Sequence, residues 1–328
     1  MRVAFFGSSR FSCMVLGRLL ASAHEIAAVV TQPDQPAGRR MTLCSTEVCG
    51  EAEALGLPVL KPENLRNNAE FRAALLSSKA DALLVASYGQ MIPAKVLKLT
   101  EWPLNVHPSL LPKLRGASPI RTALLQGLAV SGCCVMRMTP RMDDGDLLCA
   151  EEQEIGFDWN YERLESELGT MGGELAIRAL DAIGTGSAKL TPQDHSAATY
   201  CSTHTREDTW IDWSQPAERI YNFIRAWDPD FGALTQLADG RRLKIWEASY
   251  ATLPEGFALG NLALQVRPGS VVAVTPRAFW VMCGDGQVIQ VNTVQPDNRP
   301  RMSAANYVAG YTLDIIGGLG SVEDYDGE

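Results

Sequence analysis

The chain has 328 residues, 46% of them hydrophobic and 20% charged, and its formal net charge at pH 7 is −9. This composition is ordinary for a globular protein, and the length favours two domains. An acidic total argues against general binding to nucleic acid, DNA included, although one face with clustered arginines is compatible with it. The eight cysteines are scattered with no CxxC pair, which predicts reduced thiols and neither a disulfide framework nor a metal site.

No uncharged apolar run reaches the roughly 18 residues that a membrane span needs. The beginning of the chain is apolar, but Arg10, Arg18 and His24 interrupt any signal-like core. We therefore expect a cytoplasmic protein that does not engage membranes.

In the first half of the chain, short apolar runs alternate with segments of helical spacing. Strands are expected at 2–6, 26–31, 56–60, 81–87, 102–107, 133–138 and 147–155. Helices are expected at 11–20, 69–76, 119–128 and 161–183. This alternation predicts an α/β fold with a doubly wound, mainly parallel sheet. Between these elements, residues 31–40 form a long polar loop with two prolines and the paired Arg39 and Arg40.

The second half has a different pattern. Turn residues with little periodicity predict a linker over 185–208, after a first domain of residues 1–184. A helix is expected at 217–227, followed by short strands at 234–236, 243–246, 269–274, 278–283 and 288–294. Residues 209–320 are therefore expected to form a small, OB-like β-barrel domain, and 321–328 an acidic tail.

The strand at 102–107 carries the most informative side chains. Side chains two apart on a strand share a face, so Asn105 and His107 should point the same way, and Pro108 ends the strand. Strand carboxyl ends open into the ligand crevice of such sheets. An amide can donate to a carbonyl oxygen there, and an imidazole can move a proton near neutral pH. Taken alone, the pair also fits an ordinary strand end.

A second polar loop follows the strand at 133–138. It contains Asp143, Asp144 and Asp146, so a group of carboxylates is placed after another strand of the same sheet.

Together with the run Asn105-x-His107-Pro108-Ser109-Leu110-Leu111-Pro112, this loop resembles the active site of folate-dependent formyltransferases. These enzymes move a formyl group from 10-formyltetrahydrofolate to an amine. The resemblance implies a Rossmann-like catalytic domain in which Asn105, His107 and Asp143 are catalytic, with Ser109, Arg115 and Asp146 as possible supports. It also implies a folate pocket lined by Tyr88, Gln90, Ile92, Ser109, Leu110, Leu111 and Pro112, mostly through backbone groups. Residues 88–93 also fit a plain turn before a helix.

Three other segments resemble parts of family members, and two of the three resemble members that act on tRNA. The sequence TQPDQPAGR at 31–39 resembles the loop that grips the acceptor stem, which implies tRNA contacts by Arg39 and Arg40. Residues 211–217 resemble the carboxyl-terminal domain that the tRNA enzymes share with some sugar formyltransferases, and residues 301–304 resemble the end found in the tRNA enzymes in particular. Residues 41–49 lack the lysines usual in the family, and 228–233 add two acids.

The resemblance implies transfer of the formyl group from 10-formyltetrahydrofolate to the α-amino group of initiator methionyl-tRNA, without a metal. Asn105 would stabilise the oxyanion, His107 would shuttle the proton, and Asp143 would orient His107. Two alternatives stay open: an amino-sugar N-formyltransferase, which the acidic charge favours, and a non-catalytic RNA-binding protein.

Overall fold

The computed structural model describes residues 1–37, 42–237, 239–255, 257, 266–313 and 319. Its contacts group the chain into two compact units. The first unit comprises 1–120, 129–155 and 164–203, and the second comprises 121–128, 156–163 and the chain from 204 onward. The sequence predicts a first domain that is continuous up to residue 184. The observed first unit is interrupted, because two short segments, 121–128 and 156–163, pack with the second unit.

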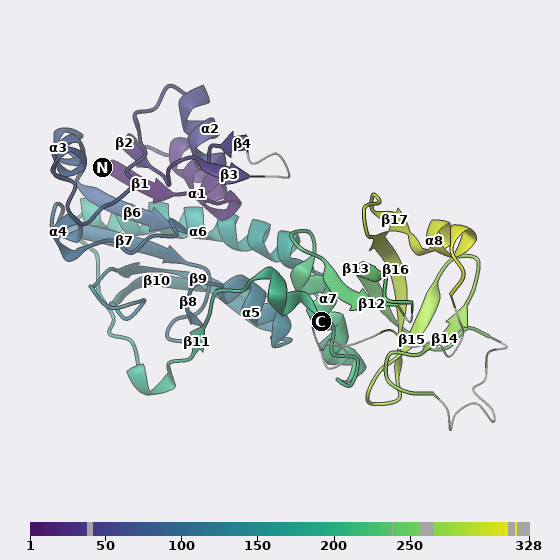
Figure 1. Ribbon diagram of the computed structural model, residues 1–328. Coiled ribbons are helices and arrows are strands. Elements are labelled where there is room, and N and C mark those ends of the chain that lie inside the picture. Colours follow the sequence, from purple (N-terminus) through teal and green to yellow (C-terminus); the bar gives the residue numbers. More distant parts are fainter. Residues whose placement is uncertain (38–41, 238, 256, 258–265, 314–318, 320–328) are drawn as a thin grey trace. The chain divides into compact units, whose positions relative to one another are not determined.

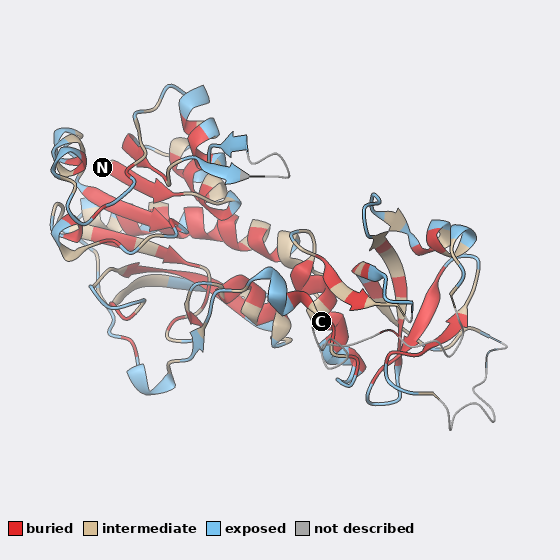
Figure 2. Cartoon of the chain, viewed as in Figure 1, coloured by how far each residue is buried: buried red, intermediate tan, exposed pale blue. Residues whose placement is uncertain are grey.

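A seven-stranded sheet forms the centre of the first unit, in the order β10-β9-β7-β6-β1-β2-β5 (Figure 1). Its strands are β1 (Arg2–Gly7), β2 (Glu25–Val30), β5 (Val59–Leu60), β6 (Ala82–Ala86), β7 (Trp102–His107), β9 (Val130–Arg137) and β10 (Leu147–Glu154). The pairings from β5 to β7 are parallel, whereas β9 and β10 run antiparallel. The predicted α/β fold with a mainly parallel sheet is confirmed. The central strands are buried, as their continuous apolar runs require (Figure 2).

The helices of this unit are α1 (Arg10–Leu20), α2 (Glu47–Ala54), α3 (Ala69–Ser77), α4 (Ala94–Leu97) and α6 (Tyr161–Gly184), and α5 (Pro119–Leu125) begins in it. The long helix α6 packs against β7. A Cβ atom on Gly172 would lie only 2.8 Å from the side chain of Val106, so the absent side chain permits this close approach. Val106 alternates with Asn105 and His107 along β7, so α6 covers the opposite face of the strand.

Two elements near residue 40 were not expected from the sequence. The polar loop at 31–40 contains β3 (Gln35–Ala37), which pairs antiparallel with β4 (Thr42–Cys44). Helix α2 follows, with the Thr46 side chain accepting a hydrogen bond from the Cys49 amide. Gly50 lies within this helix, and the short apolar stripe around it gives little periodicity to detect. Arg39 and Arg40 lie outside the described residues.

The expected linker at 185–208 is instead mostly part of the first unit, up to residue 203. Within it, β11 (Tyr200–Cys201) pairs in parallel with β8 (Arg115–Gly116), and Thr191 pairs with Leu147. A 3-10 helix, η1 (His195–Ala197), lies between these contacts. Pairing with distant backbone holds this segment, and such pairing leaves no periodic pattern in the sequence.

The second unit contains an antiparallel sheet with the strand order β12-β13-β16-β15-β14, and β17 pairs with β16. Its elements are η2 (Arg206–Thr209), α7 (Ala217–Trp227), β12 (Ala233–Gln236), β13 (Arg242–Ala251), β14 (Val271–Val274), β15 (Phe279–Met282), β16 (Val288–Pro296), β17 (Met302–Ser303) and α8 (Ala304–Gly310). Apolar residues of α7 such as Ile220 and Ile224 share one core with Trp213, Phe279 and Ile289. The predicted β domain after the first domain is confirmed, with β12 and β14 at the two ends of the strand path. The expected acidic tail lies outside the described residues.

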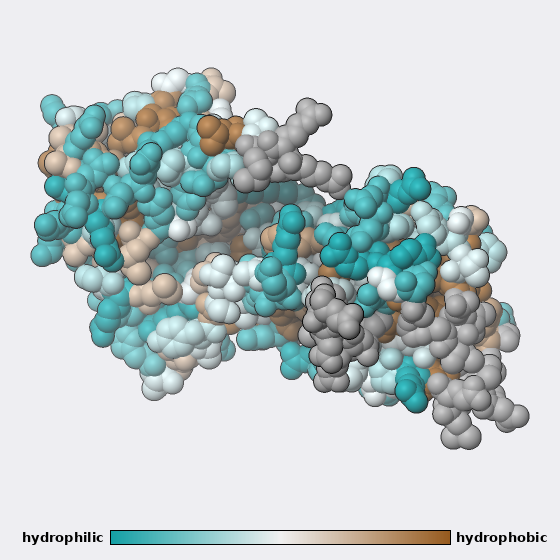
Figure 3. Space-filling model, in the orientation of Figure 1, coloured by the Kyte–Doolittle hydropathy of each residue, from teal (hydrophilic) through white to brown (hydrophobic). Residues whose placement is uncertain are grey.

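On the face seen in Figure 3, the surface is mainly hydrophilic, with apolar residues exposed in small groups. Within the part of the chain that the structure describes, no helix has both the length and the apolar character to cross a bilayer.

Candidate active site at the end of strand β7

Asn105 and His107 lie on the same face of β7, and both face one carboxylate. The Asn105 Nδ2 atom is 3.5 Å from Oδ1 of Asp143, and the His107 Nδ1 atom is 3.7 Å from its Oδ2. Only 5% of the His107 side chain and 13% of the Asp143 side chain are exposed. The structure therefore brings together the three residues that the sequence predicted to be catalytic.

A backbone carbonyl fixes the orientation of the His107 ring. Its Nε2 atom lies 2.9 Å from the carbonyl oxygen of Leu114. A carbonyl oxygen can only accept a hydrogen bond, so Nε2 carries the proton, and Nδ1 of the neutral ring has the free lone pair. This lone pair faces Asp143. The residue that orients the imidazole is therefore Leu114, and the carboxylate is placed to stabilise the ring once Nδ1 gains a proton.

Strained backbone surrounds this carboxylate. Asp143 has φ +50° and Leu114 has φ +56°, both in the left-handed region that residues with side chains rarely adopt. The amide of Gly116 donates a hydrogen bond of 2.9 Å to Oδ2 of Asp143. Gly116 has φ +119°, and a Cβ atom there would overlap the carbonyl oxygen of Cys201. Strain of this kind persists only where the surroundings enforce it, and it is concentrated at functional sites.

The sequence predicts a mainly parallel sheet with Asp143 in the loop after one of its strands, but the chain reaches Asp143 from an antiparallel strand. Because β9 runs antiparallel to β7, with Arg137 opposite Leu104, the loop after β9 starts beside the first half of β7. It must return along the sheet to place Asp143 against His107. Gly145 makes this return possible, since a Cβ atom there would overlap the Arg137 carbonyl oxygen.

Two buried residues, Gln193 and Arg115, hold this loop. Gln193 donates from Nε2 to the carbonyl oxygens of Asp143, at 3.0 Å, and Gly145, at 2.6 Å. Its Oε1 accepts hydrogen bonds from Nε and Nη2 of Arg115, at 3.2 and 2.6 Å. Arg115 also contacts Nδ1 of His195 at 2.9 Å. The resemblance implied Arg115 only as a possible support of the catalytic residues. Gln193 lies in the segment that was expected to be a linker.

Comparison with known proteins shows the family to which this chain belongs. Residues 1–180 match the family model described as formyl transferase, and residues 204–312 match formyl transferase, C-terminal domain. The chain belongs to the formyltransferase family. A methionyl-tRNA formyltransferase of Acidobacterium capsulatum is 37% identical over 314 residues, which is 95% of this chain and 97% of the relative. One of Symbiobacterium thermophilum is 38% identical over 317 residues, which is 96% and 94% of the two chains.

Two solved structures share the fold of this chain. WlaRD, a sugar 3N-formyl transferase solved with dTDP and 5-N-formyl-THF, matches with a TM-score of 0.64 and 16% identity, covering 92% of this chain and 99% of that one. HypX from Aquifex aeolicus in complex with tetrahydrofolic acid matches with a TM-score of 0.62 and 18% identity. The match covers 94% of this chain but only 47% of HypX, so the chain spans about half the length of that protein.

The residues predicted to line a folate pocket fall into two groups. The side chains of Tyr88, Ile92, Ser109 and Leu111 are buried. The Tyr88 ring packs edge-on against Phe6, burial raises the pKa of its phenol to about 12, and the Ser109 hydroxyl donates to the carbonyl oxygen of Lys113. The side chains of Gln90, Leu110 and Pro112 are partly exposed. In this formyltransferase, the first group therefore shapes the loops from within.

No group of three or more His, Cys, Asp or Glu side chains is arranged to hold a metal ion within the described residues. The eight cysteines are all described and all free, and four of them are buried.

Proposed function

We propose that this formyltransferase transfers the formyl group of 10-formyltetrahydrofolate to the α-amino group of initiator methionyl-tRNA. The observation that carries this proposal is identity of 37–38% to methionyl-tRNA formyltransferases over nearly the whole of both chains. The convergence of Asn105 and His107 on the carboxylate of Asp143 supports it from the chemical side. The reaction belongs in the cytoplasm, where the formylated tRNA serves translation initiation.

The reaction forms one carbon–nitrogen bond and breaks another. The α-amine attacks the formyl carbon, the formyl oxygen gains negative charge, and the bond to the folate nitrogen then breaks. One proton leaves the attacking nitrogen, and one proton reaches the folate nitrogen. An α-amino group titrates near pH 8, so a useful fraction is already a free base at neutral pH. The protein therefore has to stabilise the oxyanion and relay the proton.

Asn105 is suited to stabilise the oxyanion. Its amide has two N–H groups, and the one directed at Asp143 makes only a long contact of 3.5 Å, so the amide can donate to the formyl oxygen. A single donor of this kind contributes roughly 3 kcal/mol to transition-state stabilisation in other enzymes.

His107 is suited to carry the proton. Its Nε2–H group stays on the Leu114 carbonyl, which leaves Nδ1 to accept a proton from the attacking amine and pass it to the leaving nitrogen. Asp143 faces the same Nδ1 atom and stabilises the imidazolium in the interval. The Gly116 amide and Gln193 hold Asp143 and its loop in place.

The folate would lie along the loops after β6 and β7. Gln90, Leu110 and Pro112 offer partly exposed side chains, and the backbone of 88–92 and 109–112 offers hydrogen-bonding groups. Ser87 has φ +47° and Gly89 has φ +80°, so the loop after β6 makes a sharp turn beside the end of β7. This fit supports a folate co-substrate.

The assay that tests the proposal supplies 10-formyltetrahydrofolate with one amine at a time. Initiator methionyl-tRNA, non-initiator methionyl-tRNA and a panel of amino-sugar nucleotides are compared by the rate of tetrahydrofolate release. We expect turnover with initiator methionyl-tRNA that exceeds the other rates by at least an order of magnitude. Turnover confined to an amino sugar would replace the proposal with the alternative enzyme.

A variant tests the tRNA contact separately. Arg39→Ala should raise the KM for methionyl-tRNA without changing the KM for folate. The dependence of KM on salt should become shallower by about one phosphate contact, because neutralised phosphates release counterions. Wild-type behaviour of this variant at every salt concentration would remove Arg39 from the tRNA contacts.

A further inference from the structure

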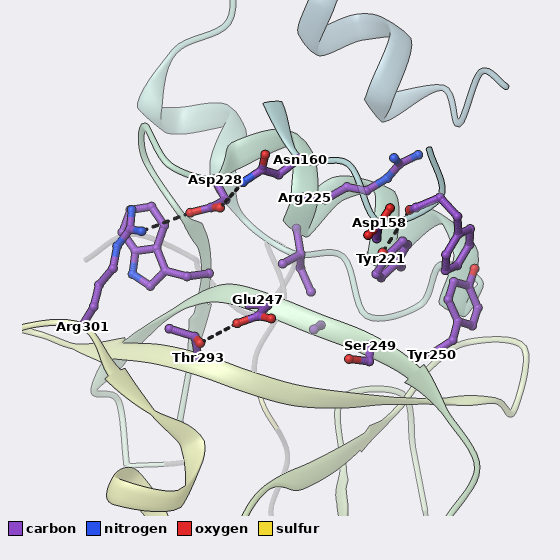
Figure 4. Close-up of a pocket in the computed structure, with 14 residues that line it drawn as sticks. Asp158, Asn160, Tyr221, Arg225, Asp228, Glu247, Ser249, Tyr250, Thr293 and Arg301 are labelled. Atoms are coloured by element: carbon purple, nitrogen blue, oxygen red, sulfur yellow. Dashed lines mark hydrogen bonds and ion pairs between the residues drawn. The ribbon is translucent and has the colours of Figure 1, made fainter. Parts of the chain in front are cut away.

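A pocket of about 450 Å³ lies within the second unit, and its lining includes none of Asn105, His107 and Asp143 (Figure 4). Its lining comes from residues of helix α7 and strands β13 and β16, together with Phe157, Asp158, Asn160, Asp228 and Arg301. Small-ligand sites in proteins typically have volumes of about 300–1,000 Å³ and combine aromatic side chains with a few polar groups. The volume and the mixed lining of this pocket fit that description.

One end of the pocket offers an exposed aromatic ring on a rigid support. Phe157 is 63% exposed, although its ring contacts two other aromatic rings. It stacks on Tyr221 with a centroid separation of 4.9 Å and contacts Tyr250 at 5.4 Å. The Tyr221 hydroxyl donates to the Phe157 carbonyl oxygen at 3.0 Å. The ring is therefore held in place while much of its surface stays open.

The other end offers a second flat surface. The Arg301 guanidinium lies 3.3 Å from the centre of the Trp246 ring. Asp228 Oδ1 at 3.1 Å and the Pro229 carbonyl oxygen at 2.8 Å fix its orientation. Aromatic rings and guanidinium planes are the side-chain surfaces on which unpaired nucleobases stack.

Between the two ends, the pocket offers the carboxylate of Glu247 as a hydrogen-bond acceptor. Glu247 receives one hydrogen bond, from Thr293 at 2.8 Å, and its carboxylate has further capacity to accept (Figure 4). Asp158 and Asp228 also line the pocket. Arg225 and Arg301 line the same pocket, and Arg301 forms an ion pair with Asp228. A carboxylate such as that of Glu247 accepts well from the exocyclic amino group of a base.

We propose that this pocket binds one unpaired nucleobase, stacked on Phe157 and read through its amino group by Glu247. The tRNA of the proposed reaction would be the source of that base, so this assignment rests on the proposed function. A free nucleotide presents the same base chemistry, and the experiment separates the two sources.

The test uses the full-length enzyme with Phe157→Ala, Phe157→Leu and Phe157→Trp. Leucine keeps apolar bulk without a ring face, whereas tryptophan keeps the face. We expect the alanine and leucine variants to raise the KM for methionyl-tRNA about tenfold, with kcat and the folate KM unchanged and with tryptophan near wild type. The salt dependence of KM should not change, because the contact is not to phosphate. Phe257→Ala is the matched control, since Phe257 is an exposed phenylalanine of the same unit outside the pocket.

Equilibrium dialysis with CMP and UMP separates the sources of the base. If the variants leave the KM for methionyl-tRNA unchanged but abolish CMP binding, the pocket binds a nucleobase from free nucleotide. Glu247→Gln should reduce a preference for CMP over UMP, because an amide can also donate to the uracil carbonyl. If neither the KM for tRNA nor nucleotide binding depends on Phe157, the inference is wrong. If the wild-type enzyme fails to formylate methionyl-tRNA, the proposed function is wrong. The dialysis experiment still tests whether the pocket binds a nucleobase, because it does not depend on formylation.

Discussion

Gln193 is the residue whose replacement most directly tests how the site is held together. Its amide nitrogen donates to the Asp143 and Gly145 carbonyl oxygens, and its amide oxygen accepts from Arg115. Gln193→Glu retains the acceptor for Arg115, now as an ion pair, but removes both donated hydrogen bonds. Gln193→Leu removes all of these interactions with little change in volume.

The expected loss in free energy of unfolding differs between the two variants. Each of the two donated bonds contributes about 1 kcal/mol, so Gln193→Glu should lower the free energy of unfolding by roughly 2 kcal/mol. Gln193→Leu also deprives the buried Arg115 of its main acceptor, which adds roughly 1–3 kcal/mol. In both variants, Asp143 loses its backbone restraint. Misplacement by about 1 Å costs on the order of a hundredfold in rate, so kcat should fall by roughly that factor.

Thermal unfolding and kcat at saturating substrates are measured together, with Gln153→Glu as the matched control. Gln153 lies on β10 in the same unit, and its side chain donates to the carbonyl oxygen of the neighbouring Glu154. The decisive result is the glutamate variant, which should lose far more activity than stability. If Gln193→Glu keeps wild-type kcat, the Asp143 loop does not depend on Gln193 and the positioning argument is wrong.

The remaining predictions concern the catalytic pair, a glycine and a partly buried histidine. Asn105→Ala and His107→Ala should each lower kcat by a factor of about 10²–10³ while unfolding temperature and folate binding stay near wild type, and wild-type kcat in either variant would exclude that residue from catalysis. Gly116→Ala should destabilise the protein by roughly 1–3 kcal/mol in a urea titration and lower kcat, because Gly116 has a left-handed backbone and a Cβ atom would overlap Cys201. In the same titration, Gly17→Ala in α1 should stabilise the protein slightly, because the space around Gly17 is open. Burial, and then the positive charge of Arg121, lower the pKa of His204, so the unfolded chain binds the proton more readily and stability should fall as pH drops below about 6.5. His204→Gln should reduce that fall between pH 7 and 5, and an unchanged pH dependence of unfolding would contradict the assignment.

The separation between stability and activity matters because the site is built from long-range contacts. Asn105 and His107 come from one strand, but Leu114, Gly116, Asp143 and Gln193 reach them from other segments. Each contact is individually modest, so most single replacements should leave a folded protein with a displaced catalytic group.

The sequence by itself determined the elements whose cause is local. Helix α7 at 217–227 and strand β7 at 102–107 have the residue ranges that periodicity and Pro108 predict, since apolar spacing and proline act over a few residues. The shared face of Asn105 and His107 follows from strand alternation alone. The family also followed from sequence, because the run at 105–112 and the aspartate loop are specific.

Only the tertiary structure decided how these parts are joined. The antiparallel direction of β9 makes the Asp143 loop return along the sheet, and a strand's apolar run is the same in either direction. The segment around Gln193 had no periodicity because single hydrogen bonds to distant backbone hold it. The rings of Tyr221 and Tyr250, which contact the Phe157 ring, lie far away along the chain, so the pocket that these residues line has no counterpart in local sequence. Hydrogen bonds and ring contacts between distant segments depend on three-dimensional position, which residue spacing does not encode.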